Sequence, residues 1–175
     1  MGLFDLKSQI KPYAYDIKQN IVRLFIDHDL PGLSQEEVCG ISLAAAYSIH
    51  SKELTSYIEM YVEETLSKEK INNIKTVVTI QTMKNVYNRS IYMAENEELR
   101  LKDPRLDKDI YLDLAITEVD LHYYSLAVAF VFGSKISIQQ EIDKAISLHG
   151  NMDAVHSIIR IASVLHASEA ALRIS

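Results

Sequence analysis

Cysteine, proline, glycine and tryptophan are scarce or absent in this chain of 175 residues, which has 1 Cys, 3 Pro, 5 Gly and no Trp. Because Cys39 is the only cysteine, the chain has no pair for an internal disulfide, no CxxC motif and no cysteine-based zinc site. The scarcity of glycine and proline excludes collagen-like and low-complexity organisation. The fold must therefore be held by an ordinary hydrophobic core.

Positive charge is also in short supply, since 18 Lys and Arg face 24 Asp and Glu and the net charge is −6. Electrostatics therefore do not support general binding to nucleic acid or to anionic membranes. The longest apolar run, residues 126–133, is far below the ~20 residues of a membrane span. The N-terminus lacks the hydrophobic stretch of a signal peptide. We expect a cytoplasmic protein with no nucleic-acid or membrane partner.

Helical periodicity is what the sequence does contain. Hydrophobic residues make up 48% of the chain, and its length suits one domain with its own core, so we expect a single domain over residues 1–175. Apolar residues recur at helical spacing between the few glycines and prolines, and alternating β patterns are nearly absent. The fold class predicted is all-α.

Local signals predict where several helices lie. Ser34-x-x-Glu37 is a capping box, which is typical of a helix start. The charged stretch 94–109 is predicted to be a loop with a turn at Pro104. In the second half of the chain, helices are predicted near 118–132, 135–148 and 152–172.

The two halves of the chain resemble each other. Residues 42–52 (SLAAAYSIHSK) and 125–135 (SLAVAFVFGSK) are identical at six of eleven positions, with an offset of 83. Alanines at helical spacing allow close helix packing, and Gly40 extends the same smooth face by one turn. Identity at the Ser-Lys pair after the helix favours duplication over chance similarity. We predict two pseudo-repeated helical halves, approximately 34–92 and 117–172.

Three motifs are distributed over almost the whole chain: YAxDIKxN at residues 13–20, EEVCG at residues 36–40, and MxNVYxR at residues 83–89, which is the most distinctive. Together with the duplicated helical plan and the length, they resemble the alkylhydroperoxidase D (AhpD) family of the carboxymuconolactone decarboxylase-like superfamily. The resemblance implies an AhpD-like helical fold.

Members of that family work through a CxxC pair in the pattern Glu-x11-Cys-x2-Cys-x3-His. Dihydrolipoamide or a lipoylated protein keeps the pair reduced, and the pair reduces an AhpC-type peroxiredoxin or an alkyl hydroperoxide directly. Members assemble as trimers or larger rings. The resemblance therefore implies a homotrimer or larger ring here, with a peroxiredoxin or a lipoylated protein as partner. We expect neither a bound cofactor nor a metal site.

Placed on this chain, the pattern falls on His122, Ser134, Ser137 and Glu141. His122 takes the Glu position, the two serines take the Cys positions, Glu141 takes the last His position, and Ile136 takes the position of a further family His. A serine hydroxyl is far less acidic than a thiol and forms no disulfide, so the family's redox cycle cannot run through Ser134 and Ser137. An introduced pair of Cys→Ser changes would not explain the other three differences, which favours natural divergence.

Two functional hypotheses follow, and the sequence leaves open whether the protein is an enzyme. The first is an AhpD-like protein of the peroxide-defence system that has lost thiol peroxidase chemistry and binds a partner or a small ligand. The second is a thiol-independent, decarboxylase- or hydrolase-like enzyme, in which Glu141 orients His122 as general base near Ser137 or Ser134.

His122 and Glu141, which exchange acid and base relative to the family pattern, also have a simpler, structural interpretation. His122 and Glu141 would form a partly buried hydrogen bond that holds two helices in register, because leaving either partner alone costs ~1–3 kcal/mol. Cys39, alone on another helix, is interpreted as a small buried apolar residue.

Overall fold

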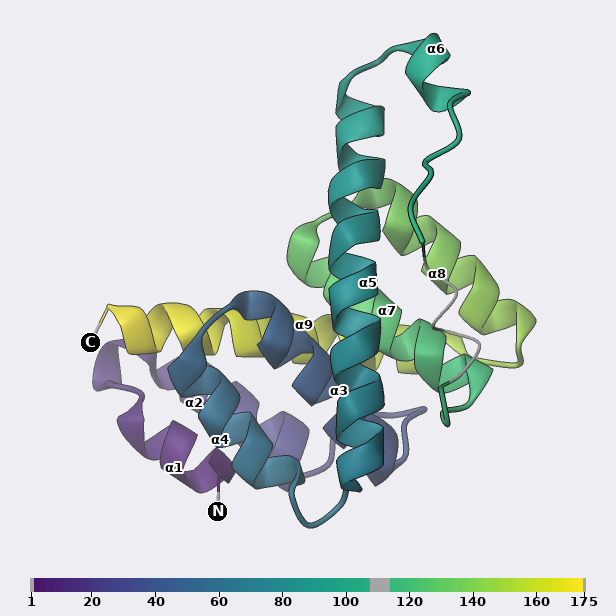
Figure 1. Ribbon diagram of the computed structural model, residues 1–175. Helices are drawn as coiled ribbons and strands as arrows, with labels where there is room; N and C mark the ends of the chain where they lie inside the picture. Colours follow the sequence, from purple (N-terminus) through teal and green to yellow (C-terminus); the bar gives the residue numbers. More distant parts are fainter. Residues whose placement is uncertain (1, 108–113, 175) are drawn as a thin grey trace.

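The computed structural model describes residues 2–107 and 114–174, and every regular element within these ranges is helical (Figure 1). This confirms the all-α prediction. The α-helices are α1 (Gly2–Gln9), α2 (Tyr15–Ile21), α3 (Gln35–Ile49), α4 (Lys52–Val62), α5 (Lys68–Met93), α6 (Glu97–Arg100), α7 (Glu118–Phe132), α8 (Lys135–Ser147) and α9 (Met152–Arg173). A 3₁₀ turn at Pro12–Ala14 precedes α2, and a π-helical turn at Val22–Ile26 follows it.

Side-chain caps set the first residue of the main helices. In the predicted capping box, the Ser34 hydroxyl accepts the Glu37 N–H at 3.3 Å, and the Glu37 carboxylate accepts the Ser34 N–H at 2.6 Å. A one-way side-chain cap, without the reciprocal bond, opens α5, α7 and α9 at Ser67, Thr117 and Asn151. The predicted boundaries of α7, α8 and α9 agree with the observed ones to within a residue. For α7 and α9 a local side-chain cap accounts for the start, whereas Ser134 at the start of α8 makes no side-chain cap hydrogen bond.

The predicted loop over residues 94–109 needs a correction, because it contains the short helix α6. The Asn96 side chain caps this helix by accepting the Leu99 N–H at 3.0 Å. Residues 101–107 are irregular around Pro104, as expected, and residues 108–109 lie outside the described part of the chain.

The centre of the core is the contact between α3 and α7. Both helices are rich in buried small residues, and Gly40 of α3 lies against Tyr124 of α7. A Cβ at residue 40 would come within 2.5 Å of the Tyr124 ring. This confirms the close helix approach predicted for Gly40.

The two similar segments adopt the same local structure. α3 ends at His50 (φ 60°) and α7 ends at Gly133 (φ 65°), both in the left-handed region. Ser51 and Ser134 then occupy the N-cap positions of α4 and α8. A third, longer helix follows in each half, α5 after α4 and α9 after α8. A duplication of 34–92 and 117–172 would produce these parallels, and it stays a prediction.

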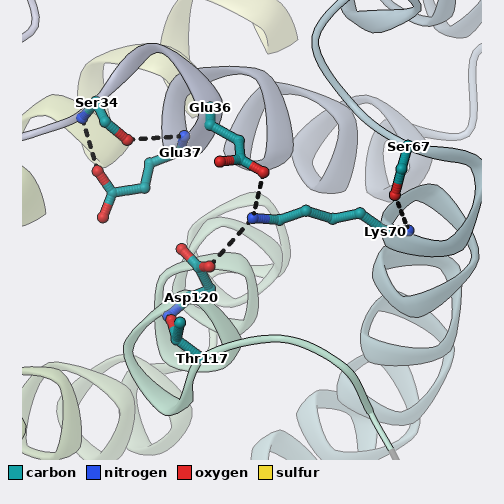
Figure 2. Close-up of polar contacts among 7 residues, drawn as sticks. All are labelled: Ser34, Glu36, Glu37, Ser67, Lys70, Thr117 and Asp120. Atoms are coloured by element: carbon teal, nitrogen blue, oxygen red, sulfur yellow. Dashed lines mark hydrogen bonds and ion pairs between the residues drawn. The ribbon is translucent and has the colours of Figure 1, made fainter.

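An ion-pair cluster joins the N-terminal ends of α3, α5 and α7 (Figure 2). Lys70 of α5 reaches between Glu36 of α3 at 3.0 Å and Asp120 of α7 at 3.3 Å. Burial lowers the pKa of Lys70, but the hydrogen bonds and charges of the two carboxylates outweigh it and raise the pKa above its ordinary value. Lys70 therefore stays charged and holds α7 in place two residues before His122.

The helix α5 is the longest element and extends past the rest of the molecule. Its buried residues all lie between positions 74 and 85. Beyond them, its C-terminal part and α6 project above the other helices in Figure 1. Within residues 2–107 and 114–174, no helix combines the length and apolar character needed to cross a bilayer.

Candidate functional site

The four residues of the family pattern lie on two packed helices. His122 is on α7, Ser134 is the N-cap of α8, and Ser137 and Glu141 lie one turn apart on α8. The left-handed turn at Gly133 directs α8 back along α7, so that residues of both helices face each other. Ser134, Ser137 and Glu141 are each 1% exposed, so the cluster is an interior one.

A short hydrogen bond joins the exchanged acid–base pair. His122 Nδ1 lies 2.7 Å from Glu141 Oε2. The His122 side chain is 15% exposed, whereas that of Glu141 is 2% exposed. The hydrogen bond therefore links α7 to α8, with His122 at the edge of the core and Glu141 inside it.

Lys84 of α5 is a further member of the site. Its Nζ lies 3.2 Å from Glu141 Oε1, so the carboxylate is held between a histidine and a lysine. Burial alone would raise the pKa of Glu141. The hydrogen bond from His122 and the positive charges of Lys84 and Lys144 outweigh burial, and the pKa falls below its ordinary value. Glu141 is thus ionised at neutral pH despite its burial.

The two serines form a separate hydrogen-bonded group. Ser134 Oγ donates to Ser137 Oγ at 3.0 Å, and Asn88 of α5 donates its amide to the same Ser137 oxygen at 3.2 Å. Within the described residues, neither serine hydroxyl is hydrogen-bonded to His122. The Ser–His contact that a serine nucleophile requires is therefore not assembled in this conformation.

Lys84 and Asn88 were missed by sequence reasoning. Both occupy the unspecified positions of the motif at residues 83–89, and their spacing of four places them on one face of α5. Lys84 contacts Glu141, 57 residues away, and Asn88 contacts Ser137, 49 residues away. A helical polar pair inside a distinctive motif was the signal that could have identified them.

The comparisons with known proteins agree with this scaffold, although no family model matches the chain. The protein named alkyl hydroperoxide reductase AhpD of Coxiella burnetii (strain RSA 493 / Nine Mile phase I) is 28% identical over 160 residues, 91% of this chain and 90% of the relative. Its namesake in Brucella suis (strain ATCC 23445 / NCTC 10510) is 24% identical over 172 residues, 98% of this chain and 97% of the relative.

A third protein named AhpD, from Rhodospirillum centenum (strain ATCC 51521 / SW), is 26% identical over 168 residues, 95% of this chain and 88% of the relative. The chain is similar to AhpD proteins over nearly its whole length. These similarities support the AhpD family.

A cleft lies beside the buried cluster, next to α5. Its volume is about 660 Å³, and it lies between α5, α8 and the irregular segment 103–107. Lys84 and Asn88 line it, and the same two side chains contact the buried Glu141 and Ser137. A molecule in this cleft would therefore meet the polar groups that hold the site together.

Cys39 does not replace a thiol of the AhpD pattern. It is buried on α3, and burial raises the pKa of its thiol in spite of hydrogen bonds from neighbouring side chains. A raised pKa disfavours the thiolate that attacks a peroxide or a disulfide. Within the described residues there is also no group of three or more His, Cys, Asp or Glu side chains arranged to hold a metal ion.

Proposed function

We infer that this chain is an AhpD-like protein that has lost thiol peroxidase chemistry and uses the former reaction site as a polar binding pocket. The observation that carries the inference is the buried pair Ser134–Ser137 at the positions where the family pattern has cysteines. Peroxide reduction by the family route passes through sulfur oxidation and a disulfide, and two hydroxyls cannot supply either.

The pocket supports binding because its donors and charges are already in place. Lys84 and Asn88 reach from the cleft to the buried cluster, and their contacts with Glu141 and Ser137 restrict both side chains. Preorganised polar groups at the floor of a cleft lower the entropic cost of binding a polar ligand.

The partner expectations belong to the same proposal. An AhpC-type peroxiredoxin or a lipoylated protein is the partner class that the similarity to AhpD proteins suggests, with a homotrimer or larger ring in the cytoplasm. Sedimentation of the purified protein with and without an AhpC-type peroxiredoxin tests the partner and the subunit number together.

The first prediction concerns peroxide turnover. We expect no reduction of an alkyl hydroperoxide by the purified protein with dihydrolipoamide as electron donor, because no thiol pair is present. The Ser134→Cys, Ser137→Cys double variant is assayed beside it, and any gained turnover would show that the scaffold still presents both positions to peroxide. Turnover by the unmodified chain would contradict the proposal, and the Cys39→Ala variant would then tell whether Cys39 is responsible.

A second candidate function is thiol-independent acid–base catalysis. The observation that favours it is the orientation of His122: Nδ1 is held by Glu141, and Nε2 has no hydrogen bond among the described residues. A histidine held in this way can accept a proton from a ligand. The serines are not in contact with it, so the candidate reaction is proton transfer, as in a decarboxylase- or isomerase-like step, rather than serine-nucleophile hydrolysis.

The His122→Gln variant separates the two candidates. If the pocket only binds, we expect a loss of unfolding free energy of about 1–3 kcal/mol, because a buried hydrogen bond to a carboxylate is weakened. The affinity for a ligand or partner should then fall only as far as the loss of stability explains. If His122 transfers protons, kcat on a panel of small carboxylic acids and lactones should fall by a factor of roughly 10² or more, beyond any change in stability. Chemical denaturation and product analysis measure the two quantities on the same samples.

A further inference from the structure

A shallow hollow lies on the side of α5 opposite Lys84 and Asn88, so it is separate from the serine cluster. Its volume is about 550 Å³, within the roughly 300–1,000 Å³ of small-molecule sites. Carbon atoms form most of its wall, which therefore suits an apolar group. The hollow is lined by Tyr47 and His50 from the end of α3 and by Lys75, Val78, Thr79 and Thr82 of α5.

Tyr47 is held in place on one side of the hollow. Its hydroxyl donates to the Glu59 carboxylate of α4 at 2.8 Å. Burial and the neighbouring carboxylate both raise the pKa of Tyr47, so the phenol stays neutral. The ammonium group of Lys75 lies over the ring, 5.8 Å from its centroid. The hollow thus has an aromatic wall with a positive charge beside it.

His50 lies at another edge of the hollow in an uncommon backbone conformation. It ends α3 in the left-handed region (φ 60°), and Gly133 (φ 65°) holds the matching position of the second half. A side chain is less favourable than glycine in this region. The imidazole ring packs edge-on against the Phe132 ring, with the centroids 6.3 Å apart and the planes at 89°. Within the described residues its nitrogens make no hydrogen bond, so they are available to a ligand.

Charge distinguishes the hollow from the cleft beside the serine cluster. The lining of the hollow includes Lys75 and no acidic residue. Among the described residues Lys75 forms no ion pair, so its charge is uncompensated within the hollow. The cleft has no such excess, because it is lined by as many acidic as basic side chains: Asp103, Asp107 and Asp143 with Lys84, Arg105 and Lys144.

The charged groups around the hollow leave this excess in place. Arg89 and Glu59 contact residues that support the hollow, and their charges are opposite. Lys52 and Glu53 adjoin each other at the start of α4. These two pairs offset each other, so Lys75 remains as one positive charge beside an apolar wall.

We propose that the hollow binds a small amphipathic carboxylate, a ligand with an apolar body and one carboxylate group. The body packs against Val78 and the ring of Tyr47, and the carboxylate pairs with Lys75 and accepts a hydrogen bond from His50. One positive charge matches a monoanion, and side chains that are already fixed lower the cost of binding. The proposal does not depend on the chemistry of the serine cluster.

A series of three ligands with the same eight-carbon body tests the charge preference. Isothermal titration compares octanoate, octanol and octylamine, which is cationic at pH 7, at concentrations below those that form micelles. We expect octanoate to bind about two- to fivefold more tightly than octanol, as for a partly exposed ion pair, and octylamine to bind most weakly. Equal affinities for octanoate and octylamine, or no binding of octanoate, would overturn the proposal.

Nuclear magnetic resonance locates the bound ligand on the full chain. On titration with octanoate, the largest shifts of backbone amide signals should fall at His50, Lys75 and Thr79. Shifts confined to Lys84 and Asn88 would place octanoate in the cleft instead and would contradict the proposed site.

Replacement of Lys75 tests the contribution of its charge. Lys75→Gln should raise the dissociation constant for octanoate about two- to fivefold and leave that for octanol unchanged. The matched control is Lys68→Gln, which removes the same charge from an exposed position at the start of the same helix. Equal effects of the two variants would show that only the net charge of the protein matters, and the site would be wrong.

Two replacements of Thr79 separate charge from shape. Thr79→Glu places a carboxylate on the wall, and Thr79→Gln places a neutral side chain of the same size there. Thr79 is exposed on α5 and both replacements are better helix formers, so the fold should be kept, which circular dichroism checks. We expect the Glu variant to bind octanoate at least about fivefold more weakly than the Gln variant, and octylamine more tightly. Equal affinities of the two variants for octanoate would overturn the proposal.

Discussion

Glu141 shows how a single buried charge shapes the site. A carboxylate in the protein interior is costly unless it is paired and hydrogen-bonded. Here His122 from α7 and Lys84 from α5 each bind one of its oxygens, at 2.7 Å and 3.2 Å. In this chain the pair joins α7 to α8; if the family's helices pack in the same way, the exchange of acid and base implied by the resemblance would keep such a pair across the same gap.

Replacing Lys84 should show how strongly the buried carboxylate of Glu141 destabilises the protein when it loses a partner. We expect Lys84→Met to lower the unfolding free energy at neutral pH by about 1–3 kcal/mol, because Glu141 loses one of its two partners while remaining buried. The control is Lys102→Met, whose ion pair with Glu98 is exposed on both sides and should contribute little. Urea denaturation at pH 7 measures both, and equal effects would contradict this assignment.

The same variant should change the acid dependence of stability. The pKa of Glu141 lies below its ordinary value of 4.5 in the folded state. Its contribution is therefore fully present above about pH 4.5 and is lost as the pH falls through the lower folded pKa. In the Lys84→Met variant, the pKa of Glu141 in the folded state should lie nearer to its value in the unfolded state. The variant should therefore lose less unfolding free energy through Glu141 as the pH falls below 4.5.

At the scale of helices, the contact between α3 and α7 depends on Gly40. The ring of Tyr124 occupies the space that a side chain at position 40 would need, and Tyr124 is fully buried. Glycine inside a helix costs roughly 0.5–1 kcal/mol relative to alanine, so its presence here reflects packing rather than helix propensity.

Gly40→Ala should therefore destabilise the protein even though alanine is the better helix former. We expect a net loss of about 1–3 kcal/mol, because overpacking a close helix contact outweighs the gain in propensity. The Gly40→Ala, Tyr124→Leu double variant provides the control, since a smaller side chain should accept the added methyl. Thermal denaturation of the unmodified chain, the two single variants and the double variant gives the coupling energy between positions 40 and 124. Strictly additive effects would show that the clash with Tyr124 does not cause the loss of stability.

At the scale of the whole molecule, α5 links the candidate site to the N-terminal ends of α3 and α7. One side of this helix carries Lys84 and Asn88 toward α8, and Val86 on the opposite side is exposed. The N-terminal end of α5 is held to α3 and α7 by Lys70 (Figure 2).

The resemblance found in the sequence was limited to what a linear pattern can contain. It located His122, Ser134, Ser137 and Glu141, and the structure brings His122 to Glu141 and Ser134 to Ser137. It did not identify Lys84 or Asn88, because these belong to another helix and their side chains meet the site only after α5 packs on α8.

The sequence by itself determined the helical fold class, the start of α3 and the boundaries of α7, α8 and α9. Capping and helical periodicity are interactions between residues three or four positions apart, so the order of residues is enough to specify them. The short helix α6 was missed because a charged, proline-containing stretch gives only a weak local signal. Only the tertiary structure decided which polar side chains meet at Glu141 and which face of α5 stays uncovered. Contacts across 49 or 57 residues depend on the packing of whole helices, and no local pattern contains that information.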